Sequence, residues 1–326
     1  MTFSAPPFGW PLPAWLGSAL ASVGVGLLLA APGPAAPGPS AQPASQVRTA
    51  DAESGLRPQL LRQGPLEAVL HHERRLDADG LVTLQPIVVV RLDGREVGRL
   101  KGAVKIGSNQ PMALLQLADL DPANPWPEVL LSSFSGGAHC CNDTRVLTSD
   151  AAGSTWHTVA LGPFNGVVRA ATDPLGLGRW VVVDGDNRFL YEFSSYAGSR
   201  PPLRIWQLNG RRFEDVSHQD AFVPLHRHAL RAMESWFEEA DGGEANGFLA
   251  GYVATKALVG EFAEGWQRML GRYDRSSDLG LRQCAAGLGS DGRCLGAEVE
   301  YATYPEALRA FLRHTGYIGR GETKRP

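Results

Sequence analysis

The pattern of apolar and polar positions divides the chain into two parts that differ in period. Between about residues 66 and 217, short apolar runs of strand length end at turn residues. Residues 87–90, for example, lead into Asp93-Gly94 and then into a second short run. A strand, a turn of this type and a second strand are the strongest short-range signal of a β-hairpin. The pattern therefore predicts antiparallel sheets in this part.

The strand signals recur at nearly even intervals. Turn residues follow apolar strands at Asp93, Asp150 and Asn209, and Asp-Pro pairs at Asp121 and Asp173 precede two further strands. A repeat of about 50 to 60 residues with several strands per unit is typical of stacked sheets or propeller blades. One unit cannot bury both faces of its sheet, so we expect neighbouring units to pack on one another.

Beyond the strands, the apolar positions follow the period of an α-helix. Apolar residues in segments 225–240 and 248–270 recur every three or four positions. Further on, Thr303 and Glu306 form a capping box, and Gly316 is a stop signal for the helix that this box begins. These features predict several helices.

Together the two patterns predict the fold class α+β. We expect a β-repeat domain of antiparallel, propeller-blade-like sheets over residues 61–217, followed by a small α-helical domain over residues 218–326. The boundary lies where the period changes from two to 3.6 residues.

The first 60 residues have a different composition. An apolar run fills residues 16–31, and no charged residue occurs before Arg48. The run is shorter than the ~20 residues of a membrane span and fits the apolar region of a secretory signal. We expect residues 1–31 to be a signal peptide or an anchor, with no other membrane span, and residues 32–60 to be a Pro/Ala-rich linker. The protein is then exported, to the periplasm or the outside of the cell.

Composition and charge narrow the classes of function. The chain has 326 residues, of which 44% are apolar and 20% charged, and its formal net charge is −3. Such a chain lacks the basic field that attracts nucleic acid. The sequence contains no phosphate-binding loop, no His-Glu-x-x-His motif and no dinucleotide fingerprint. We therefore expect no nucleic-acid partner and no organic cofactor.

The cysteines suggest disulfides. An even number, Cys140, Cys141, Cys284 and Cys294, occurs in a chain predicted to be exported. Cys284 and Cys294 flank a Gly-rich segment that can bring its ends together, which leaves Cys140 to pair with Cys141. Bridges between the two pairs and free thiols are alternatives. A third is a metal site, because His139, Cys140 and Cys141 offer soft ligands for copper(I) or zinc.

One segment resembles a known β-repeat. Residues 117–137, with Asp119 and Asp121 before an apolar strand, are similar to an FG-GAP or VCBS-type repeat. In that family an acidic loop binds calcium within a propeller blade. The resemblance implies a calcium site at Asp119, Asp121, Asn124 and Glu128. The alternative is a turn whose Asp side chains cap backbone amides.

A wider region, about residues 110–217, resembles an uncharacterised secreted bacterial family. The resemblance rests on the motif Ser-Gly-Gly-Ala-His-Cys-Cys at residues 135–141 and on Arg-Phe-Leu-Tyr at residues 188–191. It implies a fold rather than an activity.

The function that these features favour is non-catalytic binding of a protein, a glycan or a small molecule outside the cytoplasm. We expect aromatic side chains on an exposed rim, and they include Trp156, Trp180 and Tyr196. The candidate binding residues are His139, Trp126, Asp184, Asp186 and Tyr191.

The alternative is an enzyme, and no catalytic residue is assigned. Asp184 and Asp186 alternate along a predicted strand, so they could serve as the two carboxylates of a secreted hydrolase, with Glu128 or His139 nearby. Catalysis predicts that two or more of these side chains converge in one pocket. A thiol or metal site at residues 139–141 is the other alternative.

Overall fold

The structure is a computed structural model that describes residues 45–51, 53–239, 244–284 and 293–319. The predicted signal peptide or anchor, residues 1–31, lies outside the described residues. Of the helices in the described part, none is long and apolar enough to cross a membrane.

The first sheet begins at Gln59, within the last two residues of the predicted linker. Its strand order is β2-β3-β4-β5, and β6 pairs with β4. The bounds are β2 Gln59–Gln63, β3 Leu66–Leu76, β4 Val82–Leu92, β5 Arg95–Lys101 and β6 Lys105–Ile106. Asp93 and Gly94 join β4 to β5 with positive φ angles of 49° and 77°, as a tight hairpin turn requires. This predicted hairpin is confirmed.

The second sheet has the order β1-β7-β8-β9-β10. The bounds are β1 Gln46–Ala50, β7 Ala113–Ala118, β8 Glu128–Phe134, β9 Cys140–Ser149 and β10 Trp156–Asn165. Strand β1 lies within residues 32–60, so the linker prediction is wrong over this strand. Its apolar pattern is weak, and it forms by pairing its backbone with β7, from Gln46 opposite Leu117 to Ala50 opposite Ala113.

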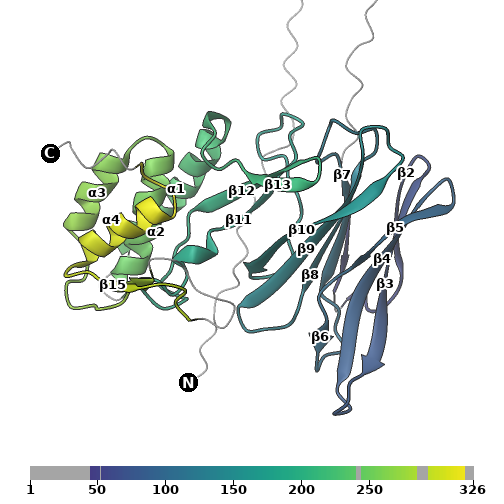
Figure 1. Ribbon diagram of the computed structural model, residues 1–326, viewed down its shortest axis with the longest axis horizontal. Coiled ribbons are helices and arrows are strands. Elements are labelled where there is room, and N and C mark those ends of the chain that lie inside the picture. Colours follow the sequence, from purple (N-terminus) through teal and green to yellow (C-terminus); the bar gives the residue numbers. More distant parts are fainter. Residues whose placement is uncertain (1–44, 52, 240–243, 285–292, 320–326) are drawn as a thin grey trace, which may run out of the picture. The chain divides into compact units, whose positions relative to one another are not determined.

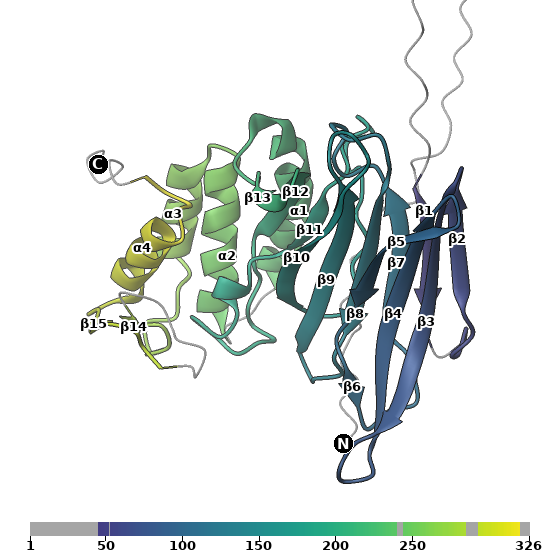
Figure 2. The same cartoon turned by 45° about the vertical axis from the view of Figure 1, so that its right-hand side comes forward.

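The two sheets pack face to face, as Figures 1 and 2 show. Side chains of β7 and β8 alternate between two cores, because successive residues of a strand point to opposite faces. Leu115 and Leu131 face the first sheet, whereas Leu114 and Leu130 face away from it. Both faces of the second sheet are therefore covered, which explains why every residue of β7 is buried.

A third sheet covers the outer face of the second. Its order is β11-β12-β13, with β11 at Val182–Gly185, β12 at Leu203–Asn209 and β13 at Arg212–Asp215. Val182 and Leu208 share a core with β7, β8 and β9. The predicted hairpin at Asn209-Gly210 joins β12 to β13 and is confirmed. The three sheets lie in layers, and the resemblance to a propeller-type β-repeat module stays a prediction.

Helices follow the sheets, and the predicted class α+β is confirmed. They are α1 Val223–Glu239, α2 Ala245–Leu258, α3 Phe262–Leu270 and α4 Tyr304–His314, with short 3₁₀ turns η1 at Asn187–Phe189 and η2 at Asp220–Phe222. A small hairpin of β14, Arg282–Cys284, and β15, Glu298–Glu300, precedes α4.

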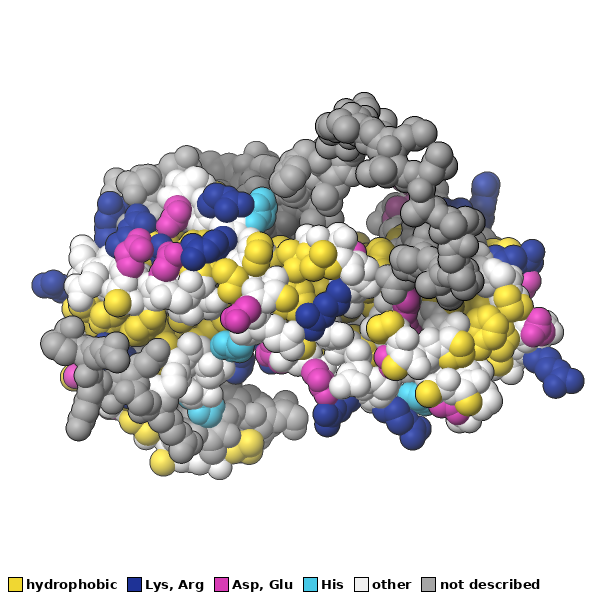
Figure 3. Space-filling view, turned by 90° about the horizontal axis from the view of Figure 1, so that it is seen from above, with side chains coloured by type: hydrophobic (Ala, Val, Ile, Leu, Met, Phe, Trp, Pro, Cys, Tyr) yellow, Lys and Arg dark blue, Asp and Glu magenta, His cyan; other side chains and the backbone are white. Residues whose placement is uncertain are grey.

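On the face drawn in Figure 3, acidic and basic side chains are interspersed, so no large area of one sign is visible there.

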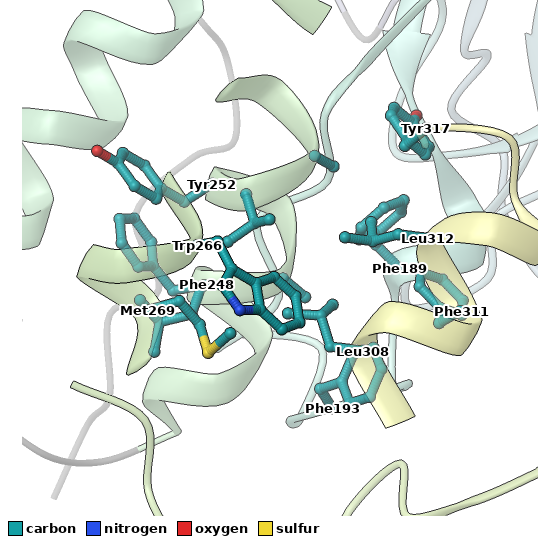
Figure 4. Packing of buried hydrophobic residues seen from close by; sticks show 14 of the residues in the cluster. Phe189, Phe193, Phe248, Tyr252, Trp266, Met269, Leu308, Phe311, Leu312 and Tyr317 are labelled. Atoms are coloured by element: carbon teal, nitrogen blue, oxygen red, sulfur yellow. The ribbon is translucent and has the colours of Figure 1, made fainter. Parts of the chain in front are cut away.

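The helices share a core with residues that precede the predicted boundary at residue 217. Phe189 contacts Phe311 edge to face at 4.8 Å between ring centroids, and Phe193 contacts Tyr304 at 5.2 Å. Figure 4 shows Phe189 and Phe193 beside the residues of α4. The segment before β12 is therefore part of the helical core.

Helix α2 lies close to the segment that leads into β12. A Cβ atom added at Gly247 would overlap the side chain of Ser194, and one added at Gly251 would overlap the carbonyl oxygen of Arg200. These two glycines let the backbone of α2 approach this segment closely, so α2 is buried along most of its length.

Candidate functional site

The His-Cys-Cys segment lies where the chain enters β9. The structure joins Cys140 to Cys141 by a disulfide, three residues after Gly137. Gly136 has a φ of 96°, and a Cβ atom at Gly137 would overlap the carbonyl oxygen of Cys140. Backbone bonds fix the segment, because Gly166 donates its N–H to the His139 carbonyl at 2.8 Å. The glycines are thus needed for the turn that presents His139 and the disulfide together.

Three aromatic rings meet at this turn. The His139 ring stacks on Tyr196, with centroids 4.0 Å apart and planes 23° apart. Tyr191 lies 5.6 Å from Tyr196 and 6.5 Å from His139. His139 is exposed, and Tyr191 is 57% exposed. We call His139, Tyr191, Tyr196 and the adjacent disulfide the His139 cluster.

The backbone of Tyr191 carries strain. Its φ is 63°, in the left-handed region that a residue with a Cβ atom disfavours by about 1–2 kcal/mol. The ring is mostly exposed, so its packing does little to offset that cost. Such strain persists where the surrounding structure imposes it, and it is common at ligand-binding positions.

A charged pair lies next to the His139 cluster. The Arg169 guanidinium contacts the Asp184 carboxylate at 3.2 Å, and Asp184 is 6% exposed. Burial raises the pKa of the Asp184 carboxyl, although Arg169 acts in the opposite direction. Burial also raises the pKa of the Tyr196 hydroxyl, and nearby Tyr191 and Asp184 raise it further. Within the described residues, Asp184 Oδ2 and Arg169 Nε are buried without a hydrogen-bond partner.

The structure therefore brings together three of the five predicted binding residues: His139, Asp184 and Tyr191. The sequence did not single out Arg169, which lies on a segment without a regular pattern. It named Tyr196 only among the rim aromatics. Arg169 and Tyr196 are both far from His139 in the sequence, so only the fold shows that they lie near it.

Asp186 lies two residues from Asp184 but has a different role. Its carboxylate accepts hydrogen bonds from the Arg188 guanidinium and from the Tyr317 hydroxyl, the latter at 2.9 Å. It is fully buried. Asp186 thus ties the segment after β11 to the end of the chain beyond α4.

The residues of the predicted calcium loop lie around a buried carboxylate. Glu128 Oε2 accepts the backbone N–H groups of Leu120 and Asp121, and Oε1 accepts bonds from Asn124 and Thr148. Burial raises the pKa of Glu128 to about 7, against these hydrogen bonds, which lower it.

Asp121 accepts hydrogen bonds from the Ala123 and Gly210 N–H groups. Its oxygens therefore cap backbone amides, as in the Asp-capped turn that is the alternative to a calcium site. Among the described residues, no group of three or more His, Cys, Asp or Glu side chains is placed to hold a metal ion. Calcium at Asp119, Asp121, Asn124 and Glu128 stays a prediction.

Trp126 belongs to this loop and not to the His139 cluster. Its indole lies against Gly153, in the turn between β9 and β10. That turn is at the Ser149 end of β9, whereas the disulfide is at the Cys140 end, roughly 30 Å away along a strand of this length. Trp126 therefore lies apart from the His139 cluster, and its role in binding stays a prediction.

The second disulfide lies apart from the site. Cys284, at the end of β14, is joined to Cys294, with α-carbons 5.4 Å apart. No described cysteine is free. This bridge closes the segment between the strands of the small hairpin before α4.

Comparison with known proteins relates the chain to a family. Residues 226–316 match the family described as the sll0997 C-terminal domain. A protein of Synechocystis sp. (strain ATCC 27184 / PCC 6803 / Kazusa), named "Probable thylakoid lumen protein sll0997", is 45% identical over 260 residues, which are 79% of this chain and 75% of that protein.

The protein y4bJ of Sinorhizobium fredii (strain NBRC 101917 / NGR234) is 34% identical over 268 residues, and these cover 81% of this chain but only 41% of that protein. No solved structure matches. The extent of the similarity to the Synechocystis protein shows that the chain belongs to the sll0997 family.

Proposed function

We propose that this is an exported binding protein that takes a carbohydrate ligand at the His139 cluster. Export is supported by the apolar run before the linker, by two disulfides and by the similarity to a protein named as a probable thylakoid lumen protein. Disulfides persist in oxidising compartments, such as the periplasm or the outside of the cell.

The observation that carries the proposal is the exposed, strained aromatic surface. Rings from three separate positions, His139, Tyr191 and Tyr196, meet beside a disulfide, and the first and second are exposed. Tyr191 has a φ of 63°, and its backbone N–H donates a hydrogen bond to the Ser199 hydroxyl at 3.3 Å. Binding gives this arrangement a purpose, since ligand sites are where such strain is retained.

The size and chemistry of the surface favour a sugar. The apolar face of a sugar ring can lie on an aromatic ring, and its hydroxyls can reach the neighbouring Arg169 and Asp184 pair. A stable protein interface needs about 800 Å² on each partner, far more than three rings supply. A small apolar ligand prefers an enclosed pocket, whereas these rings are open to solvent.

The rival proposal of a hydrolase has less support. Of the four candidate residues, Glu128 is fully buried in its loop and Asp186 is held by Arg188 and Tyr317. Asp184 and His139 lie near the same aromatic rings, but Asp184 is paired with Arg169. The geometry provides no exposed pair of carboxylates among these residues.

A glycan array tests the proposal. The oxidised full chain is applied to immobilised oligosaccharides beside a Tyr191→Gly/Tyr196→Ala double variant. We expect the wild type to bind a defined set of glycans and the variant to lose that set. Binding to none of the glycans, or equal binding by both proteins, would contradict the proposal. Selective binding to a peptide array instead would favour a protein ligand.

A further inference from the structure

A second candidate binding region is a cavity beside β10. This cavity, of about 700 Å³, is formed by residues 158–164 of β10, by residues 185–188 and by the β12–β13 hairpin, including Arg204, Trp206 and residues 211–213. This volume falls within the range of about 300–1,000 Å³ that is usual for ligand pockets. It is therefore large enough for a small organic ligand.

The lining of this cavity, which we call the arginine cavity, is rich in arginine. Arg188, Arg204, Arg211 and Arg212 line it, and Asp186 is its one acidic residue. The protein as a whole has a net charge of −3, so this concentration of arginine is local. A cavity with one sign of charge concentrates ligands of the opposite sign.

The arginines differ in how far their charge is already paired. Arg188 is bound to Asp186, and Arg204 contacts Asp215 at 2.7 Å. Arg212 contacts Glu214 at 2.6 Å, at an exposed site where the attraction is weak. Arg211 makes no ion pair or hydrogen bond with any residue that the structure describes, and it is exposed. At least one guanidinium therefore remains available to a ligand.

The wall beside these charges is flat and apolar. The Arg204 guanidinium lies over the Trp206 ring, 4.3 Å from its centroid, which holds both groups in place. Phe164 and Phe213 also line the cavity. The Trp206 Nε1 is buried and has no hydrogen-bond acceptor among the described residues.

A smaller cavity adjoins the first. It has a volume of about 330 Å³, and its lining includes His157, Asn209 and two acidic residues, Asp121 and Asp150. Arg211 lines both cavities. Arg211 thus borders two cavities of different charge, and an anionic group is favoured on the side of the arginine-lined cavity and disfavoured beside Asp121 and Asp150.

We propose that the arginine cavity binds an oxyanion-bearing ligand, with a phosphate or carboxylate group held by Arg211 and the ligand body against Trp206. Guanidinium groups bind both anions through paired N–H donors, so this chemistry is shared. The proposal does not depend on carbohydrate binding at the His139 cluster. The two sites use different residues and can be tested separately.

The test is calorimetric titration of the oxidised full chain with inorganic pyrophosphate and, separately, with citrate. Pyrophosphate represents phosphate ligands and citrate represents carboxylate ligands. The variant is Arg211→Gln, and the matched control is Arg95→Gln, which removes an exposed arginine of the β4–β5 hairpin that does not line the cavity. We expect Arg211→Gln to weaken binding about tenfold or more, because a charge-assisted hydrogen bond is lost, and the control to match the wild type.

Binding of either probe that depends on Arg211 supports the proposal and shows which anion is preferred. Two results would overturn it: neither probe binds at millimolar concentration, or both variants bind as the wild type does. Both variants remove one positive charge, so an equal weakening in the two would also count against it, because it would show only a general attraction. Glycan binding by the Arg211→Gln protein reports on the His139 cluster independently.

Discussion

Glu128 shows how one residue can make stability depend on pH. Its carboxylate is fully buried and accepts four hydrogen bonds that join the turn before β8 to Thr148 of β9. Burial raises its pKa from 4.5 to about 7. An acid with a raised pKa binds its proton more tightly in the folded state than in the unfolded state.

The free energy of unfolding should therefore fall as the pH rises from about 4.5 to about 7, by up to about 3 kcal/mol from this group alone. The contribution is fully present below pH 4.5 and is lost above the folded pKa. Glu128→Gln should remove this dependence, because the amide does not titrate. Urea unfolding of both proteins at pH 5 and pH 8 measures it. The same loss of stability in both proteins would show that Glu128 is not its source.

At the scale of single elements, α2 depends on two glycines for its position. Gly251→Ala should lower the free energy of unfolding by about 3 kcal/mol, because the added methyl group meets the Arg200 carbonyl oxygen. Gly271→Ala is the matched control, since its nearest neighbour would be at an ordinary 3.6 Å. Chemical denaturation compares the two. Equal stability would mean that α2 does not lie as close to the Ser194–Arg200 region as described.

The disulfides also act at the scale of elements. We expect no free thiol in the denatured, unreduced protein, and Cys294→Ser should cost about 2 kcal/mol because the unfolded chain regains loop freedom. Cys140→Ser should cost less, because a ring between neighbouring residues restricts little of the unfolded chain. Thiol titration and peptide mapping are the measurements. Two reactive thiols, or a bridge between the two pairs, would contradict this account.

Local chemistry made some elements predictable from the sequence. Asp93-Gly94 and Asn209-Gly210 specify their hairpins, and Thr303 begins α4 by accepting the Glu306 N–H. Strand β1 was not predictable, because its residues carry little apolar pattern and its partner is distant in sequence. The same reason hid the contacts of Arg169, whose guanidinium meets Asp184 of β11 and whose backbone N–H donates to Ser132 of β8.

At the scale of the whole molecule, the helical part is not independent of the residues before it. Phe189 and Phe193 pack into its core, and Asp186 binds the Tyr317 hydroxyl. A fragment of residues 218–326 lacks all three. We expect it to lose its helical circular dichroism without a cooperative thermal transition, whereas the full chain should melt cooperatively. A sharp transition in the fragment would restore the predicted boundary at residue 217.

The central claim is that the His139 cluster exists to bind a ligand and not to stabilise the fold. Tyr191→Gly separates these roles, because glycine accepts a φ of 63° and removes the ring. The decisive measurement is titration of the wild type and of Tyr191→Gly with the glycan that binds best on the array, with thermal melting of the same samples. The account predicts about tenfold weaker binding and a free energy of unfolding unchanged within about 1 kcal/mol. Undiminished binding, or a large loss of stability with binding intact, would contradict it.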